Sequence, residues 1–280
     1  MSLRNKGTGM KESVVRPVSI LSTRGLIPAV VHGPCEPAGR ANEPAGVVLC
    51  CHGLLSAKDS SKFVGMAEHL SQKGLWAVRF DFTGCGENTS RFGASLVETR
   101  LDDLQCVVGW ARTIPEPWGG EAVLGLFGSS LGGFLSYAFA GFFPSVVRAL
   151  ALWAAPARLL EIAGGAKPRP LELEHAWPFE LPLGTPNAVD GFPPVPNVLM
   201  VHGTDDERVP WHHAVDYYRC AGEEKRLLLL EGADHRLTDP GARAMASKAT
   251  VSWFVSKLMA RGPSAEKPQA GAEMPEGVES

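Results

Sequence analysis

The chain has 280 residues, of which 45% are hydrophobic and 20% are charged, values typical of a globular protein. Collagen-like, coiled-coil and wholly disordered chains are therefore excluded, and one α/β domain of about 250 residues would account for most of the length. The net charge of -3 gives no bias towards nucleic acid or an anionic membrane.

The first residues contain no apolar stretch that resembles a signal peptide, and no apolar run approaches the length of a membrane span. We therefore expect a soluble, cytoplasmic protein that does not insert into a membrane. The six cysteines form no C-x-x-C pair, so we expect reduced thiols rather than disulfides. They are Cys35, Cys50, Cys51, Cys85, Cys106 and Cys220.

Short β-rich segments alternate with longer segments whose apolar residues recur every three or four positions, a pattern typical of α/β proteins. The predicted strands span residues 14–21, 26–31, 47–51, 76–80, 122–127, 147–152, 198–202 and 226–230. Only four residues separate the first two strands, so these should form an antiparallel hairpin at the sheet edge. The later strands are separated by helical segments and should be parallel. Helices are predicted around residues 63–70, 101–111, 210–220 and 242–259 and directly after residue 132.

Two segments depart from this alternation. Residues 156–196 contain nine prolines, and we interpret them as a Pro-rich lid because their large apolar side chains should be buried. Residues 261–280 contain no aromatic side chain and are predicted to be disordered. The sequence therefore predicts a single domain over residues 13–260, with a lid insertion and a disordered tail.

The sharpest motif is G-x-S-x-G at Gly128 to Gly132, which lies between a predicted strand and a predicted helix. A serine on a tight turn at the tip of a strand presents its hydroxyl, and glycines two positions before and after leave room for the backbone. Ser130 is therefore the candidate nucleophile. Ser129 is not, because the residues two positions away from it are bulky.

A serine hydroxyl needs a base, and the base needs an orienting carboxylate. His235 is the best of the eight histidines, because it lies on a loop after a predicted strand, where sites collect in α/β sheets. His202, at the end of a strand, better suits a packing or turn-bonding role. Asp205 and Asp206 both follow that strand, and residue chemistry alone leaves the choice between them open.

Four sequence blocks resemble the α/β-hydrolase superfamily, in particular small serine esterases related to cinnamoyl or feruloyl esterases and serine aminopeptidases. The resemblance extends over most of the chain and implies the α/β-hydrolase fold: eight mostly parallel strands with an antiparallel N-terminal hairpin, helices on both faces and a short lid. The matching blocks are residues 51–55 (CHGLL), 79–86 (RFDFTGCG), 128–132 (GSSLG) and 202–210 (HGTDDERVP).

The resemblance also assigns roles to individual residues. It places the acid at Asp206 rather than Asp205, the base at His235, and the two oxyanion-hole N–H groups at Leu54 and Leu131. Two departures affect the second block, where Thr83 replaces the arginine that is usual in the family. Asn88 likewise replaces the usual serine, so the packing of this loop is in question.

We therefore expect a serine hydrolase that cleaves short or medium acyl esters, or aryl esters, through an acyl-enzyme. Trp153, Trp177 and Phe179 are predicted pocket walls. Dehalogenases and epoxide hydrolases of this fold would need Asp at position 130, and dienelactone hydrolases would need Cys. The chain has Ser at this position. The sequence contains no metal or nucleotide motif, so no cofactor and no metal are expected.

Two alternatives remain open at this stage. A peptidase or thioesterase would use the same triad, and Glu172 and Glu174 could then bind a substrate amine. A ligand-binding protein without catalysis would be expected to have lost part of the triad, which is complete here. The expected partner is a small-molecule ester, with no nucleic acid and no membrane, and the sequence also allows a homodimer.

Overall fold

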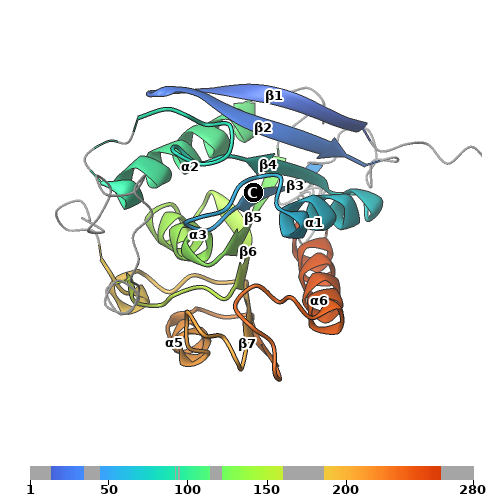
Figure 1. Ribbon diagram of the computed structural model, residues 1–280, viewed down its shortest axis with the longest axis vertical. Coiled ribbons are helices and arrows are strands. Elements are labelled where there is room, and N and C mark those ends of the chain that lie inside the picture. The colour runs from blue at the N-terminus through green and yellow to red at the C-terminus, as the bar shows by residue number, and fades with distance from the viewer. Residues whose placement is uncertain are drawn as a thin grey trace, which may run out of the picture.

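The computed structural model describes residues 14–34, 45–91, 93, 95–113, 122–159 and 186–259. These residues form one eight-stranded sheet of order β1-β2-β4-β3-β5-β6-β7-β8 (Figure 1). β1 pairs with β2, and β2 with β4, in antiparallel fashion, and all other neighbours are parallel. The strands are β1 Val14–Ser22, β2 Gly25–Gly33, β3 Ala45–Cys51, β4 Trp76–Phe80, β5 Ala122–Ser129, β6 Val147–Trp153, β7 Val198–Gly203 and β8 Lys225–Leu230.

The predicted strands and the edge hairpin are confirmed. One difference concerns the site: β5 extends to Ser129, two residues beyond the predicted end, because the strand continues without a break to the G-x-S-x-G turn. The sheet ends at β1 on one side and at β8 on the other. Arg16 on β1 and Arg226 on β8 are both exposed.

Helices cover both faces of the sheet, as predicted. The helices are α1 Ser61–Gln72, α2 Leu96–Thr113, α3 Leu131–Phe142, α5 His212–Cys220 and α6 Pro240–Leu258, with a short 3-10 helix η2 Val189–Gly191. In Figure 1, α1 and α6 lie on one side of the sheet, and α2 and α3 lie on the other. The last helix begins two residues before its predicted start, because the Asp239 carboxylate accepts a hydrogen bond from the Ala242 N–H at 2.7 Å and caps it.

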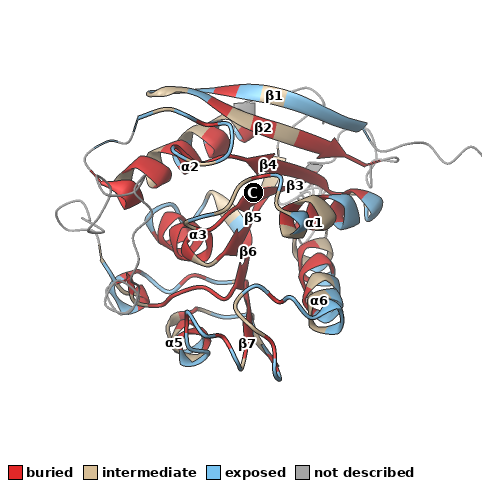
Figure 2. Ribbon diagram, in the orientation of Figure 1, coloured by how far each residue is buried: buried red, intermediate tan, exposed pale blue. Residues whose placement is uncertain are grey.

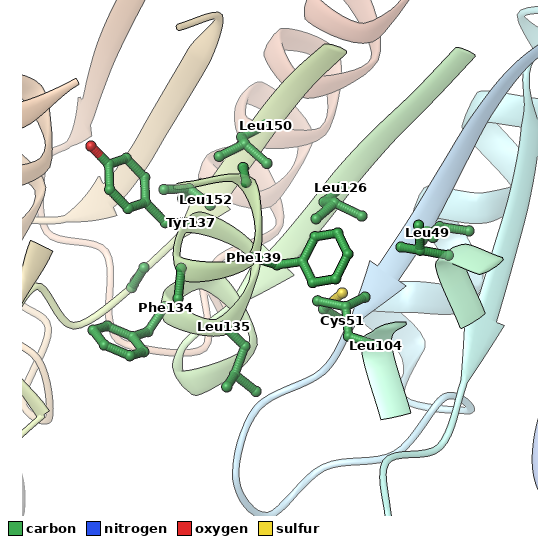
Figure 3. Close-up of a cluster of buried hydrophobic side chains, with 14 of the residues drawn as sticks. Leu49, Cys51, Leu104, Leu126, Phe134, Leu135, Tyr137, Phe139, Leu150 and Leu152 are labelled. Carbon is green, nitrogen blue, oxygen red and sulfur yellow. The ribbon is translucent and has the colours of Figure 1, made fainter. Parts of the chain in front are cut away.

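Two hydrophobic cores result from the alternation of side chains along the central strands. Leu49, Leu126 and Leu150 face the core under α2 and α3 (Figure 3). Phe127 and Trp153 face the core under α1 and α6. Because the central strands are buried on both faces (Figure 2), their carboxyl ends form a rigid edge for the loops that follow.

Most of the predicted lid and the whole predicted tail lie outside the described residues. Of the segment 156–196, the structure describes residues 156–159 and 186–196. Phe192 there packs edge-on against Phe134 of α3, with ring centroids 6.0 Å apart. In the part of the chain that the structure describes, no helix combines the length and hydrophobicity needed to cross a membrane.

Candidate active site

Ser130 occupies a strained turn between β5 and α3. Its φ of 55° lies in the left-handed region, which non-glycine residues rarely adopt. A Cβ on Gly128 would lie 2.5 Å from the carbonyl oxygen of Gly132, and a Cβ on Gly132 would lie 2.1 Å from that of Cys51. Both positions therefore require glycine, which explains the motif that the sequence displays.

Ser130, His235 and Asp206 come together from three loops at the carboxyl ends of the strands. His235 Nε2 lies 3.2 Å from Ser130 Oγ, and His235 Nδ1 lies 2.8 and 3.0 Å from the two carboxylate oxygens of Asp206. An ionised carboxylate only accepts hydrogen bonds, so Nδ1 carries the proton and Nε2 is free to accept the serine hydroxyl.

Asp206 lies in a dense set of hydrogen-bond donors. Its Oδ1 accepts the backbone N–H groups of Arg208 at 2.9 Å and Val209 at 2.8 Å, and its Oδ2 lies 3.1 Å from His202 Nε2. Burial alone would raise the pKa of Asp206, but the hydrogen bonds from His202 and His235 outweigh burial and hold this pKa well below its usual range. The carboxylate therefore stays ionised beside His235.

The structure distinguishes between the two neighbouring aspartates. Asp205 is exposed, whereas Asp206 is buried and contacts His235. Glu207 also contributes to the site, because its carboxylate accepts the His235 backbone N–H at 3.2 Å. The sequence predicts a packing or turn-bonding role for His202, and its Nε2 does lie 2.8 Å from the Val209 carbonyl oxygen of the following turn. Its contact with Asp206 is not predicted. The spacing of four residues between them gave the only signal.

The loop that carries Leu54 is fixed by two buried side chains. His52 Nδ1 lies 2.8 Å from the Gly53 carbonyl oxygen, and Arg100 Nη1 donates to the same oxygen at 3.3 Å. Arg100 Nη2 also donates to the Leu54 carbonyl oxygen at 3.1 Å. Burial, together with the charge of Arg100, lowers the pKa of His52 to about 3. His52 is therefore neutral, and its Nε2 accepts the Phe82 N–H at 3.0 Å.

An ionic network around the buried residues Lys58, Arg79 and Asp81 supports the rest of this loop, and the sequence interpretation missed it. Lys58 is 4% exposed and its Nζ lies 3.2 Å from Asp81 and 2.5 Å from Glu87. Arg79 donates to the Lys58 carbonyl oxygen at 2.5 Å and to Asp59 at 2.8 Å. Arg79 inside the apolar strand 76–80 was the feature of the sequence that indicated such a network, since buried charges need partners.

The two departures from the family block are accommodated by hydrogen bonds. Thr83 donates its backbone N–H to Asp103 at 2.7 Å and its hydroxyl to the same carboxylate at 3.2 Å. Asn88 donates to the Asp81 carbonyl oxygen at 3.0 Å. The loop beside the site is therefore firmly held despite both changes.

Of the three predicted pocket walls, the structure describes only Trp153. Trp153 is 1% exposed, and its Nε1 donates to Thr250 of α6 at 2.8 Å. Alternation along β6 directs the Trp153 side chain into the core under α1 and α6, where it lines a cavity between these helices. Its role as a wall of the substrate pocket stays a prediction. Its main chain does contact the site, because its carbonyl accepts the Ser130 N–H at 2.8 Å. Trp177 and Phe179 lie outside the described residues, as do Glu172 and Glu174.

No group of three or more His, Cys, Asp or Glu side chains that could hold a metal ion occurs among the described residues. The site is therefore described by its protein groups: a serine hydroxyl, an imidazole and a carboxylate in one hydrogen-bonded line.

Comparisons with known proteins agree with this fold. The family model described as serine aminopeptidase, S33, matches residues 42–174. Among solved structures, Est1E from Butyrivibrio proteoclasticus with bound ferulic acid has a TM-score of 0.68 at 19% identity, covering 87% of this chain and 100% of its own. A dienelactone hydrolase from Anabaena variabilis has a TM-score of 0.65 at 21% identity, covering 88% of this chain and 99% of its own.

The names of two curated relatives do not describe a hydrolase. A Mycobacterium tuberculosis protein called putative phosphoribosyl transferase Rv0571c is 27% identical over 244 residues, 84% of this chain and 47% of that protein. The uncharacterized protein YfhR of Escherichia coli O157:H7 is 27% identical over 199 residues, 70% of this chain and 65% of that protein. The chain thus spans about half the length of the mycobacterial relative.

The strand order, the turn at Ser130 and the similarity to these solved structures show the α/β-hydrolase fold. Residues 42–174, slightly less than half of the chain, are similar to the family described as serine aminopeptidase, S33, and the fold is similar to that of Est1E.

Proposed function

We propose that the protein hydrolyses carboxylic esters with short or medium acyl groups, or with aryl groups, by acyl transfer through Ser130. The observation that carries the proposal is the continuous line of hydrogen bonds from Ser130 Oγ through His235 to Asp206. His235 takes the serine proton as Oγ attacks the ester carbonyl, and Asp206 stabilises the resulting imidazolium. His235 then returns the proton to the leaving alcohol, and water cleaves the acyl-enzyme.

The tetrahedral intermediate needs N–H donors for its oxyanion. Helix α3 begins at Leu131, so the Leu131 N–H belongs to the first turn, whose N–H groups have no partner inside the helix. The second donor is the Leu54 N–H. In a trans peptide the C=O and N–H bonds point in opposite directions. Because His52 and Arg100 hold the Gly53 carbonyl, the Leu54 N–H faces away from them.

The triad does not itself define the leaving group, and the family description as serine aminopeptidase favours amide cleavage as a second candidate. Aminoacyl p-nitroanilides test this candidate, since a peptidase would cleave them and an esterase would not. Aryl esters belong in the same panel, because ferulic acid is bound to Est1E, which shares the fold.

The central experiment is labelling with a fluorophosphonate probe and mapping of the modified residue, together with hydrolysis of p-nitrophenyl acetate, butyrate and octanoate. We expect the label on Ser130 and a loss of about 1,000-fold or more in kcat for Ser130→Ala. Ser129→Ala is the matched neighbour and should still be labelled at Ser130. Labelling elsewhere, or equal hydrolysis by Ser130→Ala, contradicts the proposed triad.

A further inference from the structure

A cavity lies between α1 and α6, on the face of the sheet that carries the Trp153 side chain, which also lines it. Its volume is about 290 Å³, and its walls include Ser61, Lys62 and Gly65 of α1 and Arg243 and Ser247 of α6. Both helices begin at residues that line it, Ser61 and Pro240. The cavity therefore lies at the end of the two helices that is nearest to the catalytic loops.

The charged side chains that line this cavity are positive. Lys62 and Arg243 line it, whereas no Asp or Glu occurs among the described residues that do. Lys62 Nζ donates to Ser129 Oγ at 2.9 Å and lies 5.8 Å from the ring centroid of Trp153. Arg243 donates to the carbonyl oxygens of Leu237 at 2.9 Å and Arg236 at 3.3 Å. Within the described part of the chain, neither cation forms an ion pair.

The lowered pKa of Lys62 shows that its positive charge is disfavoured in this position. Burial, reinforced by the charges of Arg243 and Arg236, lowers the pKa of Lys62 to about 8, against the opposing influence of Asp234 and Asp206. A cation in a desolvated position is stabilised by an anion that enters beside it. The first turn of α1 adds to this preference, because Ser60 provides no side-chain cap there and a helix N-terminus favours anions.

We propose that this cavity binds a small molecule through a phosphate group. Two cations match the charge of a phosphate dianion, and Lys and Arg are the usual donors to phosphate oxygens. The hydroxyls of Ser61, Thr238 and Ser247 line the same space and can donate further hydrogen bonds. The volume is near the lower limit of ligand pockets, about 300 Å³, so the ligand is inorganic phosphate or a small phosphate monoester.

Gly65 provides a way to fill the cavity without removing a charge. It lies inside α1, lines the cavity, and a Cβ added to it would meet no atom within 4 Å. Leucine also has a higher helix propensity than glycine. Gly65→Leu should therefore fold and occupy the ligand space. Gly109→Leu in α2 is the matched control, because a Cβ there also meets no atom within 4 Å and Gly109 is not among the cavity residues.

The test is titration of the full chain with inorganic phosphate and with glycerol phosphate at constant ionic strength, followed by calorimetry and by the shift in Tm. We expect saturable binding that weakens about tenfold or more in Lys62→Gln and in Arg243→Gln, and that is lost in Gly65→Leu. The exposed residues Lys73 and Lys248 supply the charge controls, and Lys73→Gln and Lys248→Gln should bind as wild type does.

The relative affinities for the two phosphate compounds identify the ligand. Tighter binding of glycerol phosphate identifies a phosphate ester as the ligand, and tighter binding of inorganic phosphate identifies the free ion. Binding that does not saturate, that survives in Gly65→Leu, or that falls equally in the lysine controls would overturn the proposal. The measurement uses no ester and can be made on Ser130→Ala, so its result is independent of the proposed hydrolysis.

Discussion

Asp205 and Asp206 carry the same side chain at neighbouring positions, and their different burial separates their expected roles. Asp206→Asn should lower kcat for p-nitrophenyl butyrate by about 10,000-fold, because an amide favours the wrong tautomer of the imidazole. Asp205→Asn changes the same chemical group on an exposed residue and should leave kcat unchanged. Steady-state kinetics of the two variants decide the assignment, and an equal loss in both would refute it.

Asp206 also links stability to pH. Its pKa in the folded protein lies below its usual range, so the folded state favours the ionised form. This stabilisation is complete above the unfolded pKa of about 3.9 and is lost as the pH falls through the folded value. The difference in unfolding free energy between wild type and Asp206→Asn should therefore shrink as the pH is lowered from about 6 to about 3. Urea unfolding at several pH values measures it, and a constant difference would contradict the assigned shift.

Arg100 is a positioning residue for the oxyanion loop, since it is fully buried and its guanidinium contacts the carbonyl oxygens of Gly53 and Leu54. Arg100→Lys keeps the charge but loses the two-armed contact, so the Leu54 N–H should be misplaced. We expect kcat to fall by about 100-fold with little change in KM. The exposed residue Arg112 on the same helix provides the control variant Arg112→Lys. A change in KM alone would indicate a different role for Arg100.

At the level of elements, the turn between β5 and α3 depends on close contact with β3. Gly132→Ala would place a Cβ 2.1 Å from the Cys51 carbonyl oxygen, so the turn must move. We expect a lower Tm and a loss of hydrolysis of about 100-fold or more, as for other small displacements of catalytic groups. Gly109→Ala in α2 has open space and should stabilise the protein by about 0.5–1 kcal/mol. Similar effects of both substitutions on Tm would show that the close contact does not determine the stability of the turn.

At the level of the whole molecule, burial on both faces of the sheet protects the thiols of β3. Cys50 and Cys51 are fully buried, and burial raises the pKa of the Cys51 thiol to about 12. Thiol titration with Ellman's reagent should therefore count six cysteines in denaturant but leave these two unreacted in the native protein. Cys220 is partly exposed and serves as the internal reference, and equal reaction rates at the three thiols would contradict the packing.

The sequence predicts the strands, the edge hairpin and the groups around Ser130 well, because each depends on local patterns: periodicity, turn glycines and motif spacing. It does not predict the contacts that depend on tertiary packing. Arg100 and the Lys58 network meet their partners only after the sheet and α2 have formed. It also does not predict which face of the sheet Trp153 lies on, since alternation along β6 fixes its direction only once the strand register is known.

The exposed arginines on the two outer strands, Arg16 on β1 and Arg226 on β8, have a consequence for self-association. An unpaired strand edge can extend into the sheet of a second molecule, and positive side chains on such an edge oppose this because like charges would meet. Copies of this chain joined β1 to β1, or β8 to β8, would add positive charge to positive charge along the new edge. Association of like edges is therefore disfavoured, and a homodimer of this protein would be expected to form through its helices.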